Sequence, residues 1–128
     1  FESVRRDFWA TVSELFSSNY GGTIYEWCAK NRLAFTGHYE YEVPLHMQVQ
    51  CLSAAMPLYR LMHVPGFDLL GRNRPRYERP ESILLAKQTV SIANQFAKHR
   101  TLCEAFGTSL EGGNSMPLPI FSASPGGR

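Results

Sequence analysis

Short apolar segments alternate three times with segments of helical periodicity, and this alternation restricts the fold more than any other feature of the chain. Apolar residues spaced by three or four positions predict helices over residues 2–31, 49–62 and 80–97. Each helix is followed by a short apolar run that predicts a buried strand, at residues 33–38, 66–71 and 100–104. Strands that are apolar throughout are typical of a parallel sheet covered by helices. The sequence therefore predicts an α/β fold with three parallel strands.

Glycine and proline modify two of the predicted helices. Gly21-Gly22 lies within the first predicted helix and is unfavourable for a helix, but the spacing of apolar residues continues unchanged across it. This is compatible with a bend or with two consecutive helices that share one buried face. Pro57 is expected to kink or restart the second helix. Residues 39–48 lie between the first predicted strand and this helix. They are polar and aromatic and show neither the helical nor the strand spacing of apolar residues, so they predict a loop at the rim of the sheet.

Composition excludes several classes of protein. The chain has 128 residues, of which 44% are hydrophobic and 19% charged, and this is enough to bury one core. A net charge of only +2 provides no broad field for nucleic acid or anionic membranes, so neither is predicted as a partner. Cys28, Cys51 and Cys103 form no CxxC pair, and a disulfide framework or a cysteine-based zinc site is not indicated. No segment is apolar over about 18 residues, as a membrane helix would be.

Three βα units suggest a part of a larger domain. A (β/α)8 barrel, or TIM barrel, takes about 250 residues, and three strands cannot close one. We therefore expect residues 1–108 to be a partial barrel. Residues 109–128 are rich in Gly, Ser and Pro without helical period, and they predict an irregular tail. Since the chain begins with Phe1, we also expect the natural N-terminus to lie upstream, so that a missing leader is uninformative.

Glu104 is the strongest candidate for chemistry. It ends the third apolar run and directly precedes Ala105-Phe106-Gly107, an aromatic residue and a turn-forming glycine. In an α/β barrel the strand interiors are packed and the reacting groups lie at the carboxyl ends of the strands. A carboxylate at this point is therefore predicted to be catalytic, although an ion-paired glutamate at a strand end is the structural alternative.

Four segments, in this order, resemble the catalytic barrel of large bacterial glycoside hydrolases. They are Phe35-Thr36-Gly37-His38, residues 59–72 from Tyr59-Arg60 to Gly71-Arg72, Ala86-Lys87-Gln88, and Cys103-Glu104-Ala105-Phe106-Gly107. The likeness is to α-L-rhamnosidase-like enzymes and, more distantly, to the β-galactosidase and β-glucuronidase group. It implies hydrolysis of O-glycosidic bonds, with Glu104 as nucleophile or general base and no cofactor. It also implies that the general acid lies on a strand upstream of Phe1 and that the remainder of the parent barrel is a partner of this chain. Such an enzyme would be secreted or periplasmic. Cys103 stands where such enzymes usually have serine.

Further residues in or near the predicted strands are candidates for binding a carbohydrate substrate. His38, Tyr39, Glu40 and Asp68 could contact sugar hydroxyls or sugar faces. The alternatives are a structural histidine, a solvated loop for Glu40 and its neighbour Glu42, and an aspartate that bonds backbone amides. Tyr39 is expected to be exposed.

No metal site is predicted, because the other histidines show no ligand spacing with one another. They are His46, His63 and His99. The alternative function is a non-catalytic relative of the barrel that binds carbohydrate or serves as a scaffold. A strand-end carboxylate on the upstream part of the protein would favour the enzyme.

Overall fold

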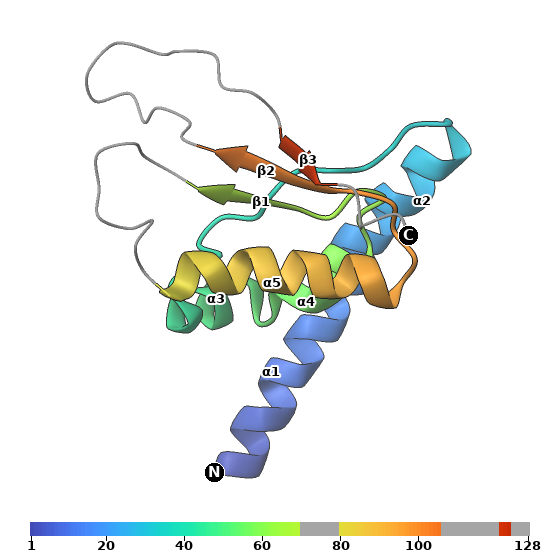
Figure 1. Cartoon of the computed structure of the whole chain (residues 1–128). Helices are drawn as coiled ribbons and strands as arrows, with labels where there is room; N and C mark the ends of the chain where they lie inside the picture. Colours follow the sequence, from blue (N-terminus) through green and yellow to red (C-terminus); the bar gives the residue numbers. More distant parts are fainter. Residues whose placement is uncertain (70–79, 106–120, 124–128) are drawn as a thin grey trace, which may run out of the picture.

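The computed structural model describes residues 1–69, 80–105 and 121–123 (Figure 1). It contains helices and a small sheet, in agreement with the predicted mixed α/β class. Strand β1 (Gly66–Leu69) pairs in parallel with β2 (Thr101–Ala105), which pairs on its other side with β3 (Phe121–Ala123). Helix α5 (Pro80–Gln95) contacts β1, β2 and α4 (Ala55–Arg60), and α4 contacts α3 (Leu45–Leu52). Figure 1 shows these three helices together on one side of the sheet.

The predicted first helix is one continuous helical run with a π-helical turn. It comprises α1 (Glu2–Phe16), the π turn η1 (Ser17–Gly22) and α2 (Thr23–Lys30), and the backbone is helical at both junctions. Gly21 is buried there, and a Cβ on it would lie 3.1 Å from Leu61 Cδ1. The absent side chain therefore lets the π turn approach α4 closely.

The expectation of one buried face along this run is wrong for α1. No residue of α1 is buried, and Val4, Phe8 and Leu15 are all more than half exposed. The physical reason is visible in Figure 1, where the N-terminal part of α1 extends away from the sheet and from the other described helices, whereas Phe16 at its C-terminal end packs against the core. None of the helices in the described part of the chain is long and apolar enough to cross a membrane.

The predicted second helix is two shorter ones, α3 and α4. They are separated at Ser53, whose φ of 62° lies in the left-handed region, and at Ala54, which is extended. The Ser53 hydroxyl donates a hydrogen bond of 2.7 Å to the Trp9 carbonyl oxygen and so ties this break to α1. Pro57 lies in the first turn of α4, where a missing N–H costs no helical hydrogen bond. The helix therefore restarts as predicted, but upstream of Pro57. Because α3 begins at Leu45, the predicted loop is also shorter than expected.

Two strand predictions need correction. The expected strand at residues 33–38 makes only one isolated parallel bridge, Thr36 with Val64. A side chain replaces continued backbone pairing here, because the Phe35 N–H donates to Nδ1 of His63 at 3.0 Å. The tail, predicted to be irregular, contributes β3, and this strand runs antiparallel to β2. Two of the three strands are thus parallel rather than all three. The remaining residues of the tail, like the end of the predicted strand at residues 70 and 71, lie outside the described residues.

The core lies among the helices beside the sheet. A cluster of buried side chains comes from the loop before α3, from α3, α4 and the residues that follow α4, and from α5. Its members are Tyr39, Leu52, Ala55, Leu58, Tyr59, Met62 and Ile92, with Phe16, Phe35 and Met56 packed against them. This packing fixes α4 and α5 beneath β1 and β2, and thereby holds the carboxyl ends of both parallel strands in place.

Candidate functional site

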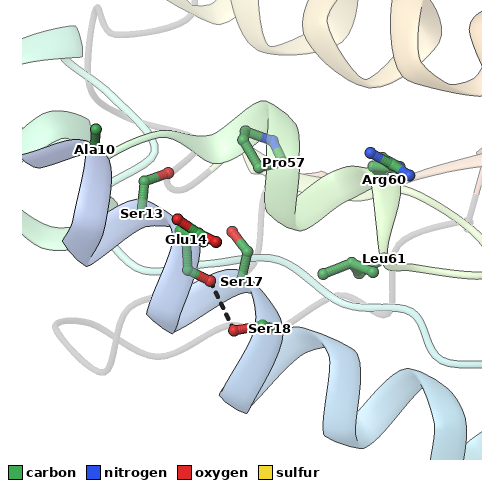
Figure 2. Close-up of a pocket in the computed structure, with 8 residues that line it drawn as sticks. All are labelled: Ala10, Ser13, Glu14, Ser17, Ser18, Pro57, Arg60 and Leu61. Carbon is green, nitrogen blue, oxygen red and sulfur yellow. Dashed lines mark hydrogen bonds between the residues drawn. The ribbon is translucent and has the colours of Figure 1, made fainter.

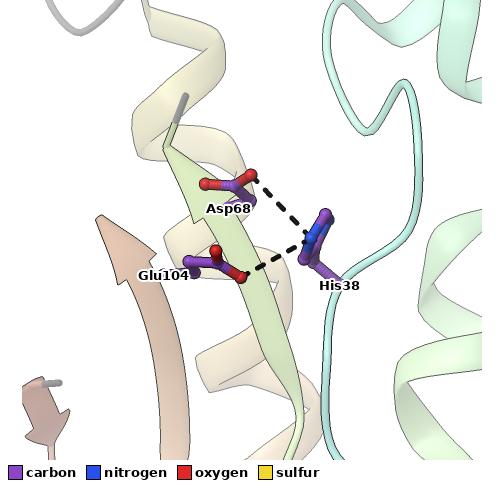
Figure 3. A group of neighbouring side chains, drawn as sticks. All are labelled: His38, Asp68 and Glu104. Carbon is purple, nitrogen blue, oxygen red and sulfur yellow. Dashed lines mark ion pairs between the residues drawn. The ribbon is translucent and has the colours of Figure 1, made fainter. Parts of the chain in front are cut away.

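Three ionisable side chains meet at the carboxyl ends of the parallel strands (Figure 3). His38 Nε2 lies 3.6 Å from Glu104 Oε2 and 3.9 Å from Asp68 Oδ2. One ligand atom from each of the three residues lies within 4.8 Å of the others. The side chain of Asp68 is only 5% exposed, whereas those of His38 and Glu104 are 38% and 58% exposed. The cluster is therefore open to solvent on one side and closed by Asp68 on the other.

Strand register brings the two carboxyl groups together. Asp68 of β1 is the direct partner of Glu104 of β2, and partners in neighbouring parallel strands project from the same face of the sheet. Both residues stand next to the last residue of their strands. The Pro65 carbonyl oxygen accepts a hydrogen bond of 2.9 Å from the Leu102 N–H and thereby aligns the start of β1 with β2.

Two glycines bring His38 to this edge. Gly37 has a φ of +147°, which side chains rarely allow, and a Cβ added to Gly66 would collide with the carbonyl oxygen of Gly37. The segment before His38 therefore lies against the beginning of β1. The Thr36 hydroxyl donates to the Val64 carbonyl oxygen at 2.8 Å, which adds a second link between the segment and β1. His38 follows these contacts directly and projects toward the two carboxyl groups in Figure 3.

Glu42 supports the cluster from beneath. Its Oε1 accepts hydrogen bonds from the Tyr59 hydroxyl at 2.7 Å and from the Tyr39 N–H at 3.1 Å, while Oε2 accepts one from the Asp68 N–H at 3.1 Å. Only 4% of Glu42 is exposed. Burial raises the pKa of Glu42 above its usual value, and the three hydrogen bonds and nearby His38 oppose this shift. One carboxyl group thus connects β1, α4 and the loop that follows His38.

The electrostatic environments of the two clustered carboxyl groups differ. Burial raises the pKa of Asp68 above its ordinary value, nearby His38 lowers it, and the negative charge of Glu104 raises it further. Asp68 Oδ1 has no hydrogen-bond partner within the described part of the chain. Cys103 precedes Glu104 on β2 and is half-buried. Burial, and after it the negative charges of Asp68, Glu42 and Glu104, raise the pKa of its thiol to about 11. The thiol is therefore a poor nucleophile at neutral pH.

The structure brings together three of the five residues predicted to act in the site, namely His38, Asp68 and Glu104. Glu40 is exposed and stands outside this cluster. Tyr39 was expected to be exposed, and this is wrong: its ring is 8% exposed and packs in the core, with its centroid 6.2 Å from that of Tyr59. The reason is that the backbone of Tyr39 is held by Glu42, so that the ring turns inward rather than to the rim.

Sequence reasoning missed the role of Glu42, which it assigned to a solvated loop. The residue lies in a segment without periodicity, so no pattern marked it as buried. His63, by contrast, is structural. Its Nδ1 accepts the Phe35 N–H, and its ring stacks on Tyr25 at 4.2 Å between centroids. Phe106 and Gly107, which belong to the motif around Glu104, lie outside the described residues.

A concave region elsewhere on the described part of the chain offers no comparable chemistry. It is an open depression of about 540 Å³ between the N-terminal helical run and α4 (Figure 2). The residues that line it are Ala10, Ser13, Glu14, Ser17, Ser18, Pro57, Arg60 and Leu61. The Ser18 hydroxyl donates to the Glu14 carbonyl oxygen at 2.8 Å, as serine hydroxyls commonly do within helices. The cluster at the strand ends is therefore the better candidate site.

Comparison with known proteins identifies no relative. Neither a protein-family model, nor a curated protein, nor a solved structure matches the chain. A function for this chain is therefore inferred from the resemblance of short segments and from the geometry of His38, Asp68 and Glu104.

Proposed function

We propose that this protein hydrolyses O-glycosidic bonds as part of a (β/α)8 barrel, with Glu104 as nucleophile or general base. The observation that carries the proposal is the pairing of Asp68 with Glu104 at the carboxyl ends of two parallel strands, beside His38. Barrel enzymes keep their reacting groups at this edge of the sheet. The four segments that resemble α-L-rhamnosidase-like enzymes make an α-L-rhamnoside the first substrate to test.

Glycoside hydrolysis needs two carboxyl groups in different protonation states, one to protonate the leaving oxygen and one to attack or to activate water. Asp68 and Glu104 have suitable environments. Glu104 is accessible to a sugar, and Asp68 is buried with a pKa raised above its ordinary value, which is the direction that a general acid requires. We therefore assign Asp68 as the second carboxyl group, in place of a residue upstream of Phe1.

The separation of the two groups favours the retaining mechanism. Their ligand oxygens lie within 4.8 Å, whereas carboxyl groups in retaining enzymes are about 5–5.5 Å apart and those of inverting enzymes about 6.5–9.5 Å. His38 places an imidazole nitrogen 3.6 Å from Glu104 Oε2, where it could donate to a sugar hydroxyl or accept from one.

The test is turnover of a panel of nitrophenyl glycosides by the full-length gene product that carries this chain. Replacement Glu104→Gln should lower kcat by about 10²-fold to 10⁴-fold, the range expected for loss of a catalytic acid or base. Glu26→Gln, an exposed glutamate on α2 that pairs with Lys30, is the matched control and should retain activity. Azide added to a Glu104→Ala variant should restore turnover, because the small anion can occupy the position of the lost carboxylate.

Other results would reject parts of the proposal. Full activity of Glu104→Gln would show that Glu104 is not catalytic. If Glu104→Gln is inactive but Asp68→Asn is active, the general acid is not Asp68 and must be a residue of the strands upstream of Phe1. Sugar binding without turnover of any glycoside would favour the non-catalytic alternative. The 128 residues alone are expected to be inactive, because an open sheet leaves strand edges uncovered.

A further inference from the structure

We propose that His38, Asp68 and Glu104 form a binding site for one divalent cation of the Zn²⁺ and Mn²⁺ type. This inference goes beyond the proposed hydrolysis and does not depend on it. Its basis is that an imidazole nitrogen and two carboxylate oxygens from three separate segments converge on one point (Figure 3).

The distances require only small adjustments to hold a cation. Metal bonds to His nitrogen and carboxylate oxygen are about 2.0–2.2 Å, which places neighbouring ligand atoms of a tetrahedral site roughly 3.4 Å apart. His38 Nε2 already lies 3.6 Å from Glu104 Oε2 and 3.9 Å from Asp68 Oδ2. Both distances are too long for a hydrogen bond, so the imidazole is close to the carboxylates without being bonded to them. The exposed Glu104 side chain can rotate to close the remaining gap.

Asp68 is the second, independent observation. Its side chain is 95% buried, since only 5% is exposed, and yet Oδ1 finds no hydrogen-bond partner among the described residues. A buried carboxylate oxygen without a partner is costly, and a second carboxylate beside it adds repulsion. Buried charges in proteins are generally paired or coordinate a metal. A cation bound by Asp68 Oδ2, Glu104 and His38 would compensate the negative charge of the buried carboxylate and offset the repulsion between the two carboxylates.

The donor set indicates the kind of cation. Imidazole suits Zn²⁺ and other transition metals, and carboxylates suit Mn²⁺ as well, whereas Mg²⁺ and Ca²⁺ prefer oxygen ligands alone. Three protein ligands also leave at least one coordination position open, as in catalytic rather than structural zinc sites. Glu42 anchors the Asp68 N–H, an outer contact of the sort that orients metal ligands. A bound cation would engage the lone pairs of Glu104 and would therefore compete with its role in hydrolysis.

The sequence analysis did not predict this site. It compared histidines with one another, whereas the ligands come from a loop and from two strands that are far apart in the chain and meet only through the β1–β2 register. Local spacing carries no signal for such a set.

Binding is tested directly on the 128-residue chain after treatment with a chelator and removal of that chelator. Calorimetric titration with Zn²⁺, and electron paramagnetic resonance titration with Mn²⁺, should each show one cation per chain. Mn²⁺ is included because thiolates select softer metals, so the three cysteines cannot account for its binding. His38→Gln, Asp68→Asn and Glu104→Gln should each weaken binding by about tenfold or more, which is at least the loss seen when outer-shell contacts are removed.

The matched control is His99→Gln, at the opposite end of β2 from Glu104, which should bind both cations like the unchanged chain. Far-ultraviolet circular dichroism of every variant shows whether it has kept its fold. The Co²⁺-loaded chain adds a readout of the ligands, because its visible bands should shift when His38 is replaced. Absence of Mn²⁺ binding, or binding that all three variants retain, would overturn the proposal. Both readouts are independent of turnover, so a failure of the hydrolysis proposal leaves them unaffected.

Discussion

The hydrogen bond from Tyr59 to Glu42 is expected to be among the most stabilising polar contacts in the described part of the chain. The Tyr59 hydroxyl donates to Glu42 Oε1 at 2.7 Å, and the Tyr59 side chain is fully buried. In Tyr59→Phe the ring keeps its packing while the donor is lost, and no water can replace it. A hydrogen bond to a charged group contributes about 1.5–3 kcal/mol, so we expect a loss of that size in the free energy of unfolding at pH values above the folded pKa of Glu42.

The loss should depend on pH in a defined direction. The Tyr59 bond lowers the pKa of Glu42 in the folded protein, so removing the bond raises that pKa further above its value in the unfolded chain. The extra stability due to the bond is therefore present above the folded pKa of Glu42 and fades as the pH falls through it. Below the folded pKa of Glu42 the acceptor is a neutral carboxyl group, and the decrease in the free energy of unfolding caused by Tyr59→Phe should shrink to about 0.5–1.5 kcal/mol.

Urea unfolding followed by circular dichroism at pH values above and below the folded pKa of Glu42 measures both values. Tyr39→Phe is the matched control, because the Tyr39 hydroxyl is buried without a hydrogen-bond partner among the described residues. Removing an unsatisfied group should leave stability unchanged or raise it by about 1 kcal/mol. If Tyr59→Phe costs no more than Tyr39→Phe, or costs the same at both pH values, Glu42 does not act as the charged acceptor described above.

Three further predictions concern the site and its support. The folded pKa of Asp68 is raised, so its contribution to stability is full below the ordinary aspartate range and is lost as the pH rises through the folded value. Metal-free Asp68→Asn should therefore be more stable than the unchanged chain at pH 7 but not in strong acid, as thermal unfolding would show. Gly66→Ala should destabilise the fold by about 2 kcal/mol or more in urea, because the new Cβ meets the backbone of Gly37. The Cys103 thiol, with a pKa of about 11, should react with a disulfide reagent far more slowly than exposed Cys51, as mass spectrometry of labelled peptides would reveal.

Much of the fold could be predicted because its signals are local. Helical periodicity identified α5 and the N-terminal helical run, and short apolar runs identified β1 and β2. The break at Ser53 could not be predicted, because it depends on a left-handed residue and on a hydrogen bond to the distant Trp9 carbonyl. The strand expected at residues 33–38 failed for a similar reason, since a side chain of the neighbouring segment takes the place of a backbone partner.

The burial of Tyr39 and Glu42 in the loop at the rim of the sheet could not be predicted from local sequence patterns either. Residues 39–48 are polar and aromatic in composition, which favours a solvated loop, yet Tyr39 and Glu42 are both buried. Glu42 is accommodated there only because three donors from separate parts of the chain converge on its carboxyl group. A buried charge of this kind is recognisable from its partners, and no pattern in a single segment specifies them.

The cluster itself shows how far strand ends can be used to find a site. Position at a predicted strand end was enough to select His38 and Glu104, and Asp68 was selected as a polar residue in or near the second predicted strand, but the meeting of the three depends on register. In the observed register Asp68 is opposite Glu104, and a shift of β2 by one residue would turn Glu104 to the other face of the sheet. Because both strands are apolar over most of their length, hydrophobic pattern alone does not select between these registers. A contact that aligns the two strands lies at the opposite end of β1, where the Leu102 N–H bonds the Pro65 carbonyl oxygen. At the same end Gly66 packs against Gly37, the residue before His38. A substitution at Gly66 should therefore disturb the site by displacing the segment that carries His38, although it touches none of the three ionisable side chains.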